Sequence, residues 1–270
     1  MLNVTPDSFS DGGKYFDPEL AVNWGLQMAE EGADIIDVGG ESSRPGSEPV
    51  PAEEELRRVL PVVTALSPRT RVSIDTAKAA VAEAALEAGA SIVNDITASL
   101  CSVAAEGGAG WVAMHMQGVP RTMQQDPRYS DVVGEVSAFL VARAEEALAA
   151  GITELWVDPG IGFGKTTTHN LALLKHIGRI VELGYPVMVG ASRKSFIGQV
   201  IGSSPFEPDH PGPVAVDDRL AGSLAAAVWA MGQGVAAVRV HDVAPTAEAA
   251  ILVGAHIEGS LDTEELACPA

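Results

Sequence analysis

Cysteine is almost absent from this chain of 270 residues, which contains only Cys101 and Cys268. Two cysteines give no disulfide framework, and so little cysteine is typical of a reducing compartment. No apolar run is long enough to span a membrane, and no segment has the pattern of a signal peptide. We therefore expect a cytoplasmic protein with no membrane partner.

Positive charge is also scarce. The chain has 17 Lys and Arg residues against 36 Asp and Glu residues, which gives a formal net charge of −19. This charge disfavours nucleic acid or an anionic membrane as a partner. It does not exclude a small anionic substrate, and it makes the few clusters of Lys and Arg more informative.

Short apolar runs alternate along the chain with segments whose apolar residues are at helical spacing. Strands are expected at residues 1–4, 34–38, 71–74, 91–93, 110–114, 154–157, 186–190 and 235–240. Helices are expected at residues 18–31, 77–88, 132–149, 171–183, 217–232 and 246–255, from residue 52 onward, and around residue 103.

Eight strand-then-helix units without a linker predict one domain over residues 1–270, closed into a single (β/α)8 TIM barrel of the α/β class. A doubly wound open sheet is the structural alternative. The acidic tail, residues 259–270, is expected to be frayed. In a barrel, the carboxyl ends of the strands and the loops after them form the active face.

Polar side chains gather at the predicted strand ends. Single polar residues at strand ends are common, but a set of eight at one end is difficult to explain by chance, so we expect the active site there. The eight are Asn3, Asp75, Asn94, His115, Asp158, Lys194, Arg239 and His241.

Residues 186–195 (PVMVGASRKS) run from a buried strand directly into two cations and two hydroxyl groups. A helix start in that position favours an anion or a polar ligand, because unpaired N–H groups and the positive dipole end point the same way. A solvated helix start is the alternative.

Arg239 and His241 are two residues apart in a predicted strand, so their side chains share a face. A cation and an imidazole can together hold phosphate oxygens, and the last strands of such barrels often bind phosphate. A buried ion pair of Arg239 with Asp37 or Asp242 is the alternative.

Asp75, Asn94 and Asp158 come from different strands and should point across the barrel mouth. Carboxylates and amides placed in this way match a flat heterocycle rich in N–H groups. Metal ligation by the two aspartates is a weaker alternative, because a transition metal usually recruits His or Cys. Asn3 could reach a Mg²⁺ held mainly by substrate phosphates, or it could orient the first loop.

Residues 160–165 (GIGFGK) superficially resemble a nucleotide-binding loop, but their spacing fits neither the dinucleotide nor the P-loop motif. We interpret the glycines as turn residues that let Phe163 lean over the site. Ser43 and Ser192 have no general base beside them in the sequence, so a serine nucleophile is not expected.

Five motifs in chain order resemble those of the dihydropteroate synthase family, over essentially the whole chain. They are residues 3–13 (NVTPDSFSDGG), 39–46 (GGESSRPG), 158–165 (DPGIGFGK), 192–194 (SRK) and 239–243 (RVHDV). The resemblance implies a (β/α)8 transferase of folate synthesis. It would join 4-aminobenzoate to 6-hydroxymethyl-7,8-dihydropterin diphosphate and release pyrophosphate with Mg²⁺ present. It also implies inhibition by sulfonamides, which mimic 4-aminobenzoate, and a homodimer formed through barrel helices.

The same resemblance implies a role for each matching residue. The pterin-binding residues would be Asp75, Asn94, Met116, Asp158, Phe163, Lys194 and Arg239. The phosphate-binding residues would be Asn3, Arg239 and His241, with Asn3 also the metal ligand. The aminobenzoate-binding residues would be Phe9, Ser43, Arg44, Pro45, Phe163 and Ser195. The catalytic residues would be Asp11, Arg44 and Lys194.

Two stretches depart from the family pattern. The chain begins at Met1 inside the predicted first strand, where the family has further residues, so we expect upstream residues to lengthen that strand and raise stability. Residues 95–99 (DITAS) replace a more usual glycine-rich continuation. Two other functions stay open: a pterin-binding barrel that transfers methyl groups to a corrinoid protein, and a non-catalytic paralogue that binds ligand for regulation.

Overall fold

The computed structural model describes residues 1–5, 17–42, 46–203 and 212–258, with side chains described up to residue 254. The expected frayed tail, residues 259–270, lies outside this part. The strands are β1 (Leu2–Asn3), β2 (Ile35–Gly39), β3 (Arg71–Asp75), β4 (Ile92–Asp95), β5 (Gly110–Met114), β6 (Leu155–Asp158), β7 (Met188–Val189) and β8 (Ala237–Val238). The helices are α1 (Pro18–Glu30), α2 (Ala52–Leu66), α3 (Ala79–Glu87), α4 (Cys101–Glu106), α5 (Val132–Ala149), α6 (Thr167–Lys175), α7 (Ile177–Val181), α8 (Ser195–Gly202), α9 (Leu220–Gly232) and α10 (Val243–Glu258), with a short 3-10 helix η1 (Val216–Arg219).

The strands are parallel and follow one another in chain order. Strands β1 to β6 form one sheet, and β7 pairs with β8. A bridge between Val157 and Val187 joins β6 to the β7 segment. The amine of Met1 donates to the carbonyl of Val240 at 2.7 Å, which brings the β1 segment beside the end of the β8 segment. This consecutive order confirms the (β/α)8 barrel and excludes a doubly wound sheet, whose strand order reverses.

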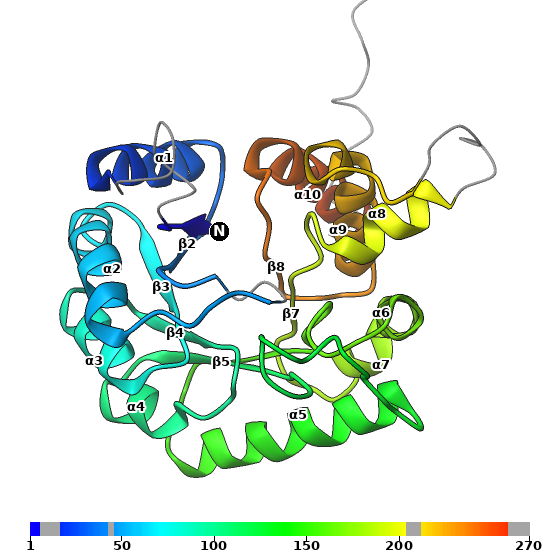
Figure 1. Ribbon diagram of the computed structural model, residues 1–270, viewed down its shortest axis with the longest axis horizontal. Coiled ribbons are helices and arrows are strands. Elements are labelled where there is room, and N and C mark those ends of the chain that lie inside the picture. Colours follow the sequence, from blue (N-terminus) through cyan, green and yellow to red (C-terminus); the bar gives the residue numbers. More distant parts are fainter. Residues whose placement is uncertain (6–16, 43–45, 204–211, 259–270) are drawn as a thin grey trace, which may run out of the picture.

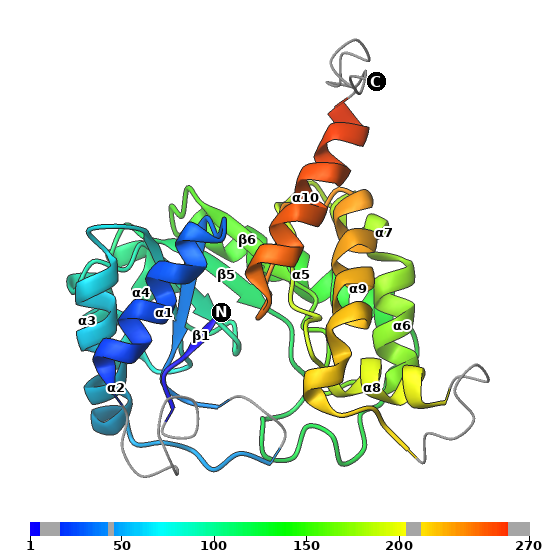
Figure 2. The same ribbon diagram turned by 90° about the horizontal axis from the view of Figure 1, so that it is seen from above.

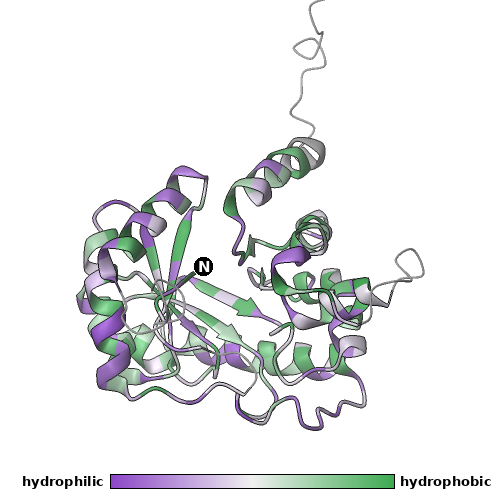
Figure 3. Cartoon of the chain, turned by 45° about the horizontal axis from the view of Figure 1, so that its top comes forward, coloured by the Kyte–Doolittle hydropathy of each residue, from purple (hydrophilic) through white to green (hydrophobic). Residues whose placement is uncertain are grey.

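The helices surround the strands, as the barrel requires (Figure 1). The view from above shows α10 extending past α9 towards the C-terminus (Figure 2). Hydrophobic residues concentrate on the strands and on the helix faces that pack against them, with polar residues outside (Figure 3). Of the helices described, none combines the length and the hydrophobicity needed to cross a bilayer.

Two helical segments differ from the prediction. The single helix expected over residues 171–183 is two helices, α6 and α7, because His176 leaves the helical conformation at φ −110°. α6 begins earlier than expected, at Thr167, because the Thr166 hydroxyl and the His169 ring cap its first turn reciprocally. α8 starts immediately after the Lys194 position, where the sequence indicates only that a helix could begin.

Asp95 organises residues 95–99, the stretch that departs from the family pattern. Its Oδ1 accepts from the Thr97 amide at 2.9 Å, and its Oδ2 accepts from the amides of Ser99 and Leu100, each at 2.6 Å. Trp111, fully buried in β5, donates its indole N–H to the same carboxylate at 3.3 Å. The side chain of Asp95 thereby supplies the acceptors that shape this loop.

Candidate active site at the carboxyl ends of the strands

An arginine at the barrel mouth joins side chains from three other strands. Arg239 follows β8, and its Nε donates to Asp37 Oδ2 of β2 at 2.5 Å. Its Nη2 donates to Asp75 Oδ2 at the end of β3. The same Asp37 oxygen accepts from Asn94 Nδ2 of β4 at 3.1 Å. Residues up to 202 positions apart in the sequence therefore meet at one end of the barrel.

Burial and charge act in opposite directions within this cluster. Burial acts to lower the pKa of Arg239, but Asp37 and Asp75 outweigh it and raise that pKa, so the guanidinium stays charged. Burial raises the pKa of Asp75 to about 7, although Arg239 opposes the shift. Burial thus favours the protonated form of Asp75 and Arg239 favours the ionised form, so a ligand that replaces water changes the balance between them.

The sequence motifs give no role to Asp37. Its ion pair with Arg239 is one of the alternatives that the sequence predicts. It lies in the middle of a buried strand, so only its charge within an apolar run marks it. Its Oδ1 is buried and has no hydrogen-bond partner among the described residues. A buried acceptor without a donor costs free energy, which an N–H group of a bound molecule would relieve.

Asp158 and Lys194 face the site from β6 and from the start of α8. Asp158 is 4% exposed, and its Oδ1 accepts from the Gly160 amide at 2.7 Å. Burial raises the pKa of Asp158, while the Lys194 ammonium and the Gly160 amide oppose that shift. Burial in turn lowers the pKa of Lys194 to about 8, although Asp158 opposes this shift. Asp158 thus supplies a hydrogen-bond acceptor to the site, and Lys194 supplies a cation.

An apolar wall stands beside these polar groups. Phe163, at the β6–α6 loop, lies under the Lys194 ammonium, which is 4.4 Å from the centre of its ring. Its neighbours in one buried cluster are Ile96, Met114 and Met123, and the partly buried Met116 packs against them. The expected position of Phe163, leaning over the site, agrees with this contact. A wall of Met and Phe beside carboxylates suits a flat ring with polar edges.

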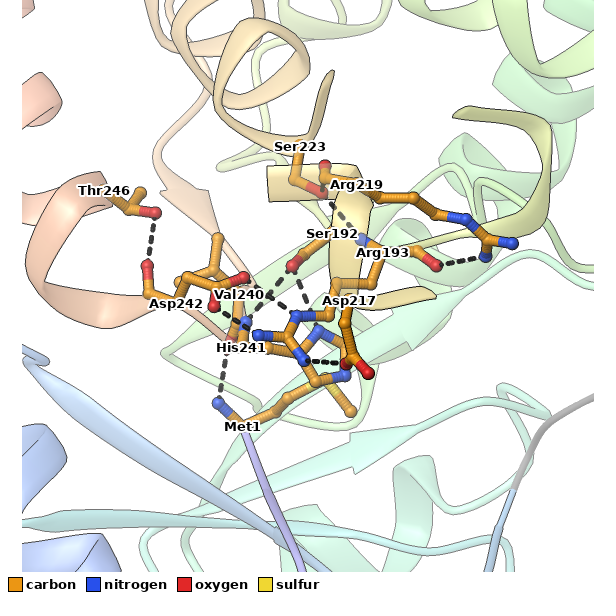
Figure 4. Close-up of polar contacts among 10 residues, drawn as sticks. All are labelled: Met1, Ser192, Arg193, Asp217, Arg219, Ser223, Val240, His241, Asp242 and Thr246. Atoms are coloured by element: carbon orange, nitrogen blue, oxygen red, sulfur yellow. Dashed lines mark hydrogen bonds and ion pairs between the residues drawn. The ribbon is translucent and has the colours of Figure 1, made fainter. Parts of the chain in front are cut away.

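A second polar group lies where β7 and β8 end (Figure 4). His241 Nδ1 is 3.0 Å from Ser192 Oγ, and the His241 amide donates to the same hydroxyl at 3.2 Å. Arg193 adopts a left-handed conformation at φ +59°, and its guanidinium makes two hydrogen bonds to the Asp242 carboxylate. Asp242 therefore pairs with Arg193, and the predicted alternative in which it pairs with Arg239 is wrong.

Comparison with known proteins identifies the family. Residues 1–241 match the model of the pterin binding enzymes. The chain is 45% identical over 263 residues to dihydropteroate synthase of Escherichia coli K12, covering 94% of this chain and 89% of that protein. It is 42% identical to the dihydropteroate synthase of Mycobacterium leprae, covering 99% and 96%. The chain belongs to the dihydropteroate synthase family.

Solved structures of the same family agree with this assignment. The Yersinia pestis dihydropteroate synthase, solved with a sulfonamide drug, matches with a TM-score of 0.85 and 42% identity over 96% of this chain and 93% of that chain. The Xanthomonas albilineans dihydropteroate synthase, solved with 7,8-dihydropteroate, matches with a TM-score of 0.79 and 41% identity over 99% and 92%. The family and the barrel expected from the five motifs are confirmed, and the chain is a transferase.

Not all family positions fall in the described part of the chain. Phe9, Asp11, Ser43, Arg44 and Pro45 lie outside it. Two further positions are described: Asn3, half-buried, pairs in register with Gly39 of β2, and Ser195 is the exposed first residue of α8. Within the described residues, no three His, Cys, Asp or Glu side chains are placed to hold a metal ion. A site built around transition-metal ligands is therefore absent from that part.

His115 directly follows β5 but does not join the Arg239 cluster. Its Nδ1 is 2.9 Å from the ammonium of Lys165, and its ring packs edge-on against Phe139. Burial lowers the pKa of His115 from 6.5 to about 3, and the Lys165 charge adds to the shift. His115 is thus a neutral acceptor at physiological pH, and its partner Lys165 is a residue that the motifs leave without a role.

We predict that His115→Gln makes the free energy of unfolding less sensitive to acid. Because the folded pKa lies below the ordinary 6.5, the contribution of neutral His115 is complete above that pH. It is lost as the pH falls towards the folded value, by about 2 kcal/mol near pH 5. Glutamine cannot titrate but keeps an acceptor for Lys165. Urea unfolding of both proteins near pH 7 and near pH 5 measures the difference, and equal pH dependence would contradict a neutral buried His115.

Proposed function

We propose that this transferase joins 4-aminobenzoate to 6-hydroxymethyl-7,8-dihydropterin diphosphate, giving 7,8-dihydropteroate and pyrophosphate in folate synthesis. The observation that carries the proposal is the convergence of Asp75, Asn94, Asp158 and Lys194 around Arg239 at the carboxyl ends of the strands. Family structures solved with 4-aminobenzoate and with 7,8-dihydropteroate support it.

The pterin ring would lie among the acceptors and the apolar wall. Its aminopyrimidinone edge presents adjacent N–H donors, which suit the Asp158 carboxylate, while Asn94 and Asp75 would meet the opposite side. Lys194 would donate to a ring acceptor, and Phe163 and Met116 would cover a face. Arg239, already held by Asp37 and Asp75, would cover the other face with its planar guanidinium.

The diphosphate would lie towards the ends of β8 and β1. His241 and Arg239 are two residues apart, and the Met1–Val240 hydrogen bond brings the Asn3 strand alongside them. One amide oxygen at a strand end fits a Mg²⁺ that takes its other ligands from phosphates and water, and Asn3 would be that ligand. When bound, Mg²⁺ would neutralise negative charge on the departing diphosphate.

The reaction needs no protein nucleophile. The bond between the pterin methylene and the diphosphate oxygen breaks, and its electron pair leaves with the diphosphate. The amine of 4-aminobenzoate then donates its lone pair to the methylene carbon and loses a proton. Fixed carboxylates around the ring stabilise the positive charge that develops on the pterin, and Arg239 and His241 stabilise the leaving group.

4-Aminobenzoate would enter from the loop side of the pterin. Phe163 and Ser195 are the described members of its proposed border, and Phe9, Ser43, Arg44 and Pro45 would complete it. Asp11 would organise the reactive complex, and Arg44 and Lys194 would act with it as catalytic residues. A sulfonamide would occupy this border in place of 4-aminobenzoate, and the sulfonamide complex of the Yersinia pestis relative supports that expectation.

We further propose a homodimer formed through the barrel helices. Large apolar side chains are exposed on the neighbouring helices α6, α8 and α9, namely Leu171, Val200, Val228 and Trp229. The Trp229 indole N–H donates to the Leu174 carbonyl at 2.7 Å, which ties α9 to α6 and holds the ring in place. A second copy of this chain would cover such a surface. Sedimentation at micromolar concentration tests the dimer, and a monomer would refute it.

Pyrophosphate release tests the reaction. With both substrates and Mg²⁺, release should depend on 4-aminobenzoate, and a chelator should stop it. A barrel that transfers methyl groups would release no pyrophosphate under these conditions. A folded sample that binds the pterin diphosphate without turnover would instead support a regulatory paralogue.

We predict that His241→Ala weakens binding of the pterin diphosphate far more than binding of the pterin alone. Burial lowers the pKa of His241 to about 3, so the ring is neutral, and its Nδ1 contact with Ser192 leaves Nε2 for a phosphate oxygen. A hydrogen bond to a charged group contributes roughly 1.5–3 kcal/mol, so the loss should be on the order of 10- to 100-fold. Calorimetric titration with both ligands measures it, and equal losses would remove the phosphate role.

A further inference from the structure

The β6–α6 loop is held by side-chain donors at every carbonyl from Gly160 to Lys165. The donors come from several parts of the chain, and each contacts the loop directly. They are Lys165 for Gly160 and Phe163, Lys194 for Ile161, Gln124 for Gly162, Tyr129 for Gly164, and Asn170 for Lys165. So many hydrogen bonds favour one conformation of the loop, which is the condition for a preorganised site.

Lys165 occupies the centre of this arrangement. Its side chain is 2% exposed, and its ammonium donates to the carbonyls of Gly160 and Phe163, each at 3.0 Å. It also reaches across to β5, with His115 Nδ1 at 2.9 Å and the His115 carbonyl at 3.3 Å. These hydrogen-bond partners are all uncharged. One cation therefore ties the end of β5 to two points of the loop after β6.

The backbone of the two segments is in close contact around this ammonium. Gly160 has φ +65°, and a Cβ there would lie 1.8 Å from the His115 carbonyl oxygen. Gly164 has φ +61°, and a Cβ there would lie 2.2 Å from the Gln117 carbonyl oxygen. The glycines allow the approach, and the Lys165 ammonium supplies the donors that the converging carbonyls require.

Two groups of the proposed pterin site depend on the position of this loop. The Gly160 amide donates to Asp158 Oδ1 at 2.7 Å, so the conformation of Gly160 sets the direction of the other carboxylate oxygen. The Phe163 carbonyl is bonded to Lys165, and its ring forms the wall beneath Lys194. A displacement of the loop would therefore turn Asp158 and move Phe163 together.

We propose that Lys165 is a positioning residue for the pterin site: its ammonium clamps the β6–α6 loop to the end of β5 and so sets Asp158 and Phe163 in the geometry that receives the ring. This inference rests on the proposed function, because it assigns Asp158 to the pterin. Lys165 itself touches neither substrate.

The electrostatic environment acts against the ammonium that this role requires. Burial lowers the pKa of Lys165 to about 7, with Asp158 opposing the shift and Lys194 adding to it. Holding an ammonium in such a place costs the fold free energy, and its removal leaves three carbonyls with fewer donors, so the two effects on stability partly cancel. Loss of the charge should consequently be seen in ligand binding more clearly than in melting temperature.

Lys165→Met is the first variant to make, with Lys175→Met as its matched control. Lys175 is an exposed lysine of α6, so the control removes the same charge from the same region without touching the loop. Calorimetric titration should show a Kd for the pterin diphosphate about 10-fold higher in Lys165→Met and unchanged in the control. If Lys165→Met does not fold, Lys165→Gln, which keeps an uncharged N–H donor group, takes its place and should show an intermediate loss.

A double-mutant cycle with Asp158→Asn separates positioning from a merely structural role. Because Lys165 is proposed to set Asp158 as well as Phe163, adding Lys165→Met to Asp158→Asn should raise the Kd only about threefold, clearly less than the increase of about 10-fold expected without Asp158→Asn. If Lys165→Met raises the Kd by the same factor with and without Asp158→Asn, the inference is overturned. An unchanged Kd in Lys165→Met or Lys165→Gln would also overturn it. Neither result would affect the proposed function. Wild-type protein that does not bind the pterin diphosphate would overturn the proposed function and this inference with it.

Discussion

Replacing Asp158 with asparagine is expected to lower the affinity for the pterin diphosphate on the order of 100-fold. An ionised carboxylate can accept two adjacent N–H groups of the pterin edge, and asparagine turns one acceptor into a donor that faces a donor. A lost hydrogen bond to a charged group, together with the unpaired donor it leaves, amounts to about 3 kcal/mol.

The same change should affect folding little. Asparagine keeps an oxygen for the Gly160 amide, which the carboxylate holds at 2.7 Å, and it removes a charge that burial disfavours. Asp126→Asn is the matched control, because its side chain is 67% exposed and pairs only with the exposed Arg128 among the described residues. Calorimetry and thermal melting of the three proteins measure both effects. A loss below about threefold, or a variant that fails to fold, would make Asp158 structural.

Arg239→Ala should have the largest effect of any single change, because it acts on the fold and on the substrate together. It leaves the buried carboxylates of Asp37 and Asp75 without their cation. Removing one partner from a buried pair typically costs about 3–5 kcal/mol of stability. Binding of the diphosphate should fall more than binding of the pterin alone, although some pterin affinity is lost with the guanidinium that covers its face.

The stability cost of Arg239→Ala should depend on pH in a defined direction. Burial already raises the pKa of Asp75 to about 7, and loss of the opposing Arg239 charge raises it further. A carboxyl whose folded pKa exceeds its unfolded pKa destabilises the fold increasingly above the unfolded pKa and fully above the folded pKa, and stability returns as the pH falls. The difference in unfolding free energy from wild type should therefore shrink from about pH 8 to about pH 5.5. A constant difference would mean that these carboxylates are not left charged and buried.

Much of this site follows from local sequence patterns. Polar residues at the ends of apolar runs predict that Asp75, Asn94, Asp158 and Arg239 converge, because parallel strands in a barrel place their carboxyl ends together. The glycines of residues 160–165 predict a turn that aims Phe163 at the site, and that turn is present. In each case, the prediction needs only one strand or turn and the direction in which the chain runs through it.

Other contacts join residues that are far apart in the sequence, and no local pattern encodes them. Asp37 is a single charge inside an apolar strand, and its contact with Arg239, which spans 202 residues, is predicted from the sequence only as one of two alternatives. Lys165 lies at the end of a glycine-rich turn in the sequence, and its contact with His115 spans 50 residues. The break between α6 and α7 falls at His176, which is neither proline nor glycine, and the nearest glycine, Gly178, lies inside α7. For such long-range pairs, the closed barrel is needed before one partner can be chosen over another.

Product formation by wild-type protein and by Asp158→Asn, with both substrates and Mg²⁺, is the decisive experiment. We predict that wild-type protein forms 7,8-dihydropteroate, identified by mass, in equal amount to the pyrophosphate released. We also predict that Asp158→Asn, folded and at limiting pterin diphosphate, forms this product on the order of 100-fold more slowly. No dihydropteroate from folded wild-type protein, or equal rates for the two proteins, would contradict the central claim that this barrel mouth holds the pterin for the transfer.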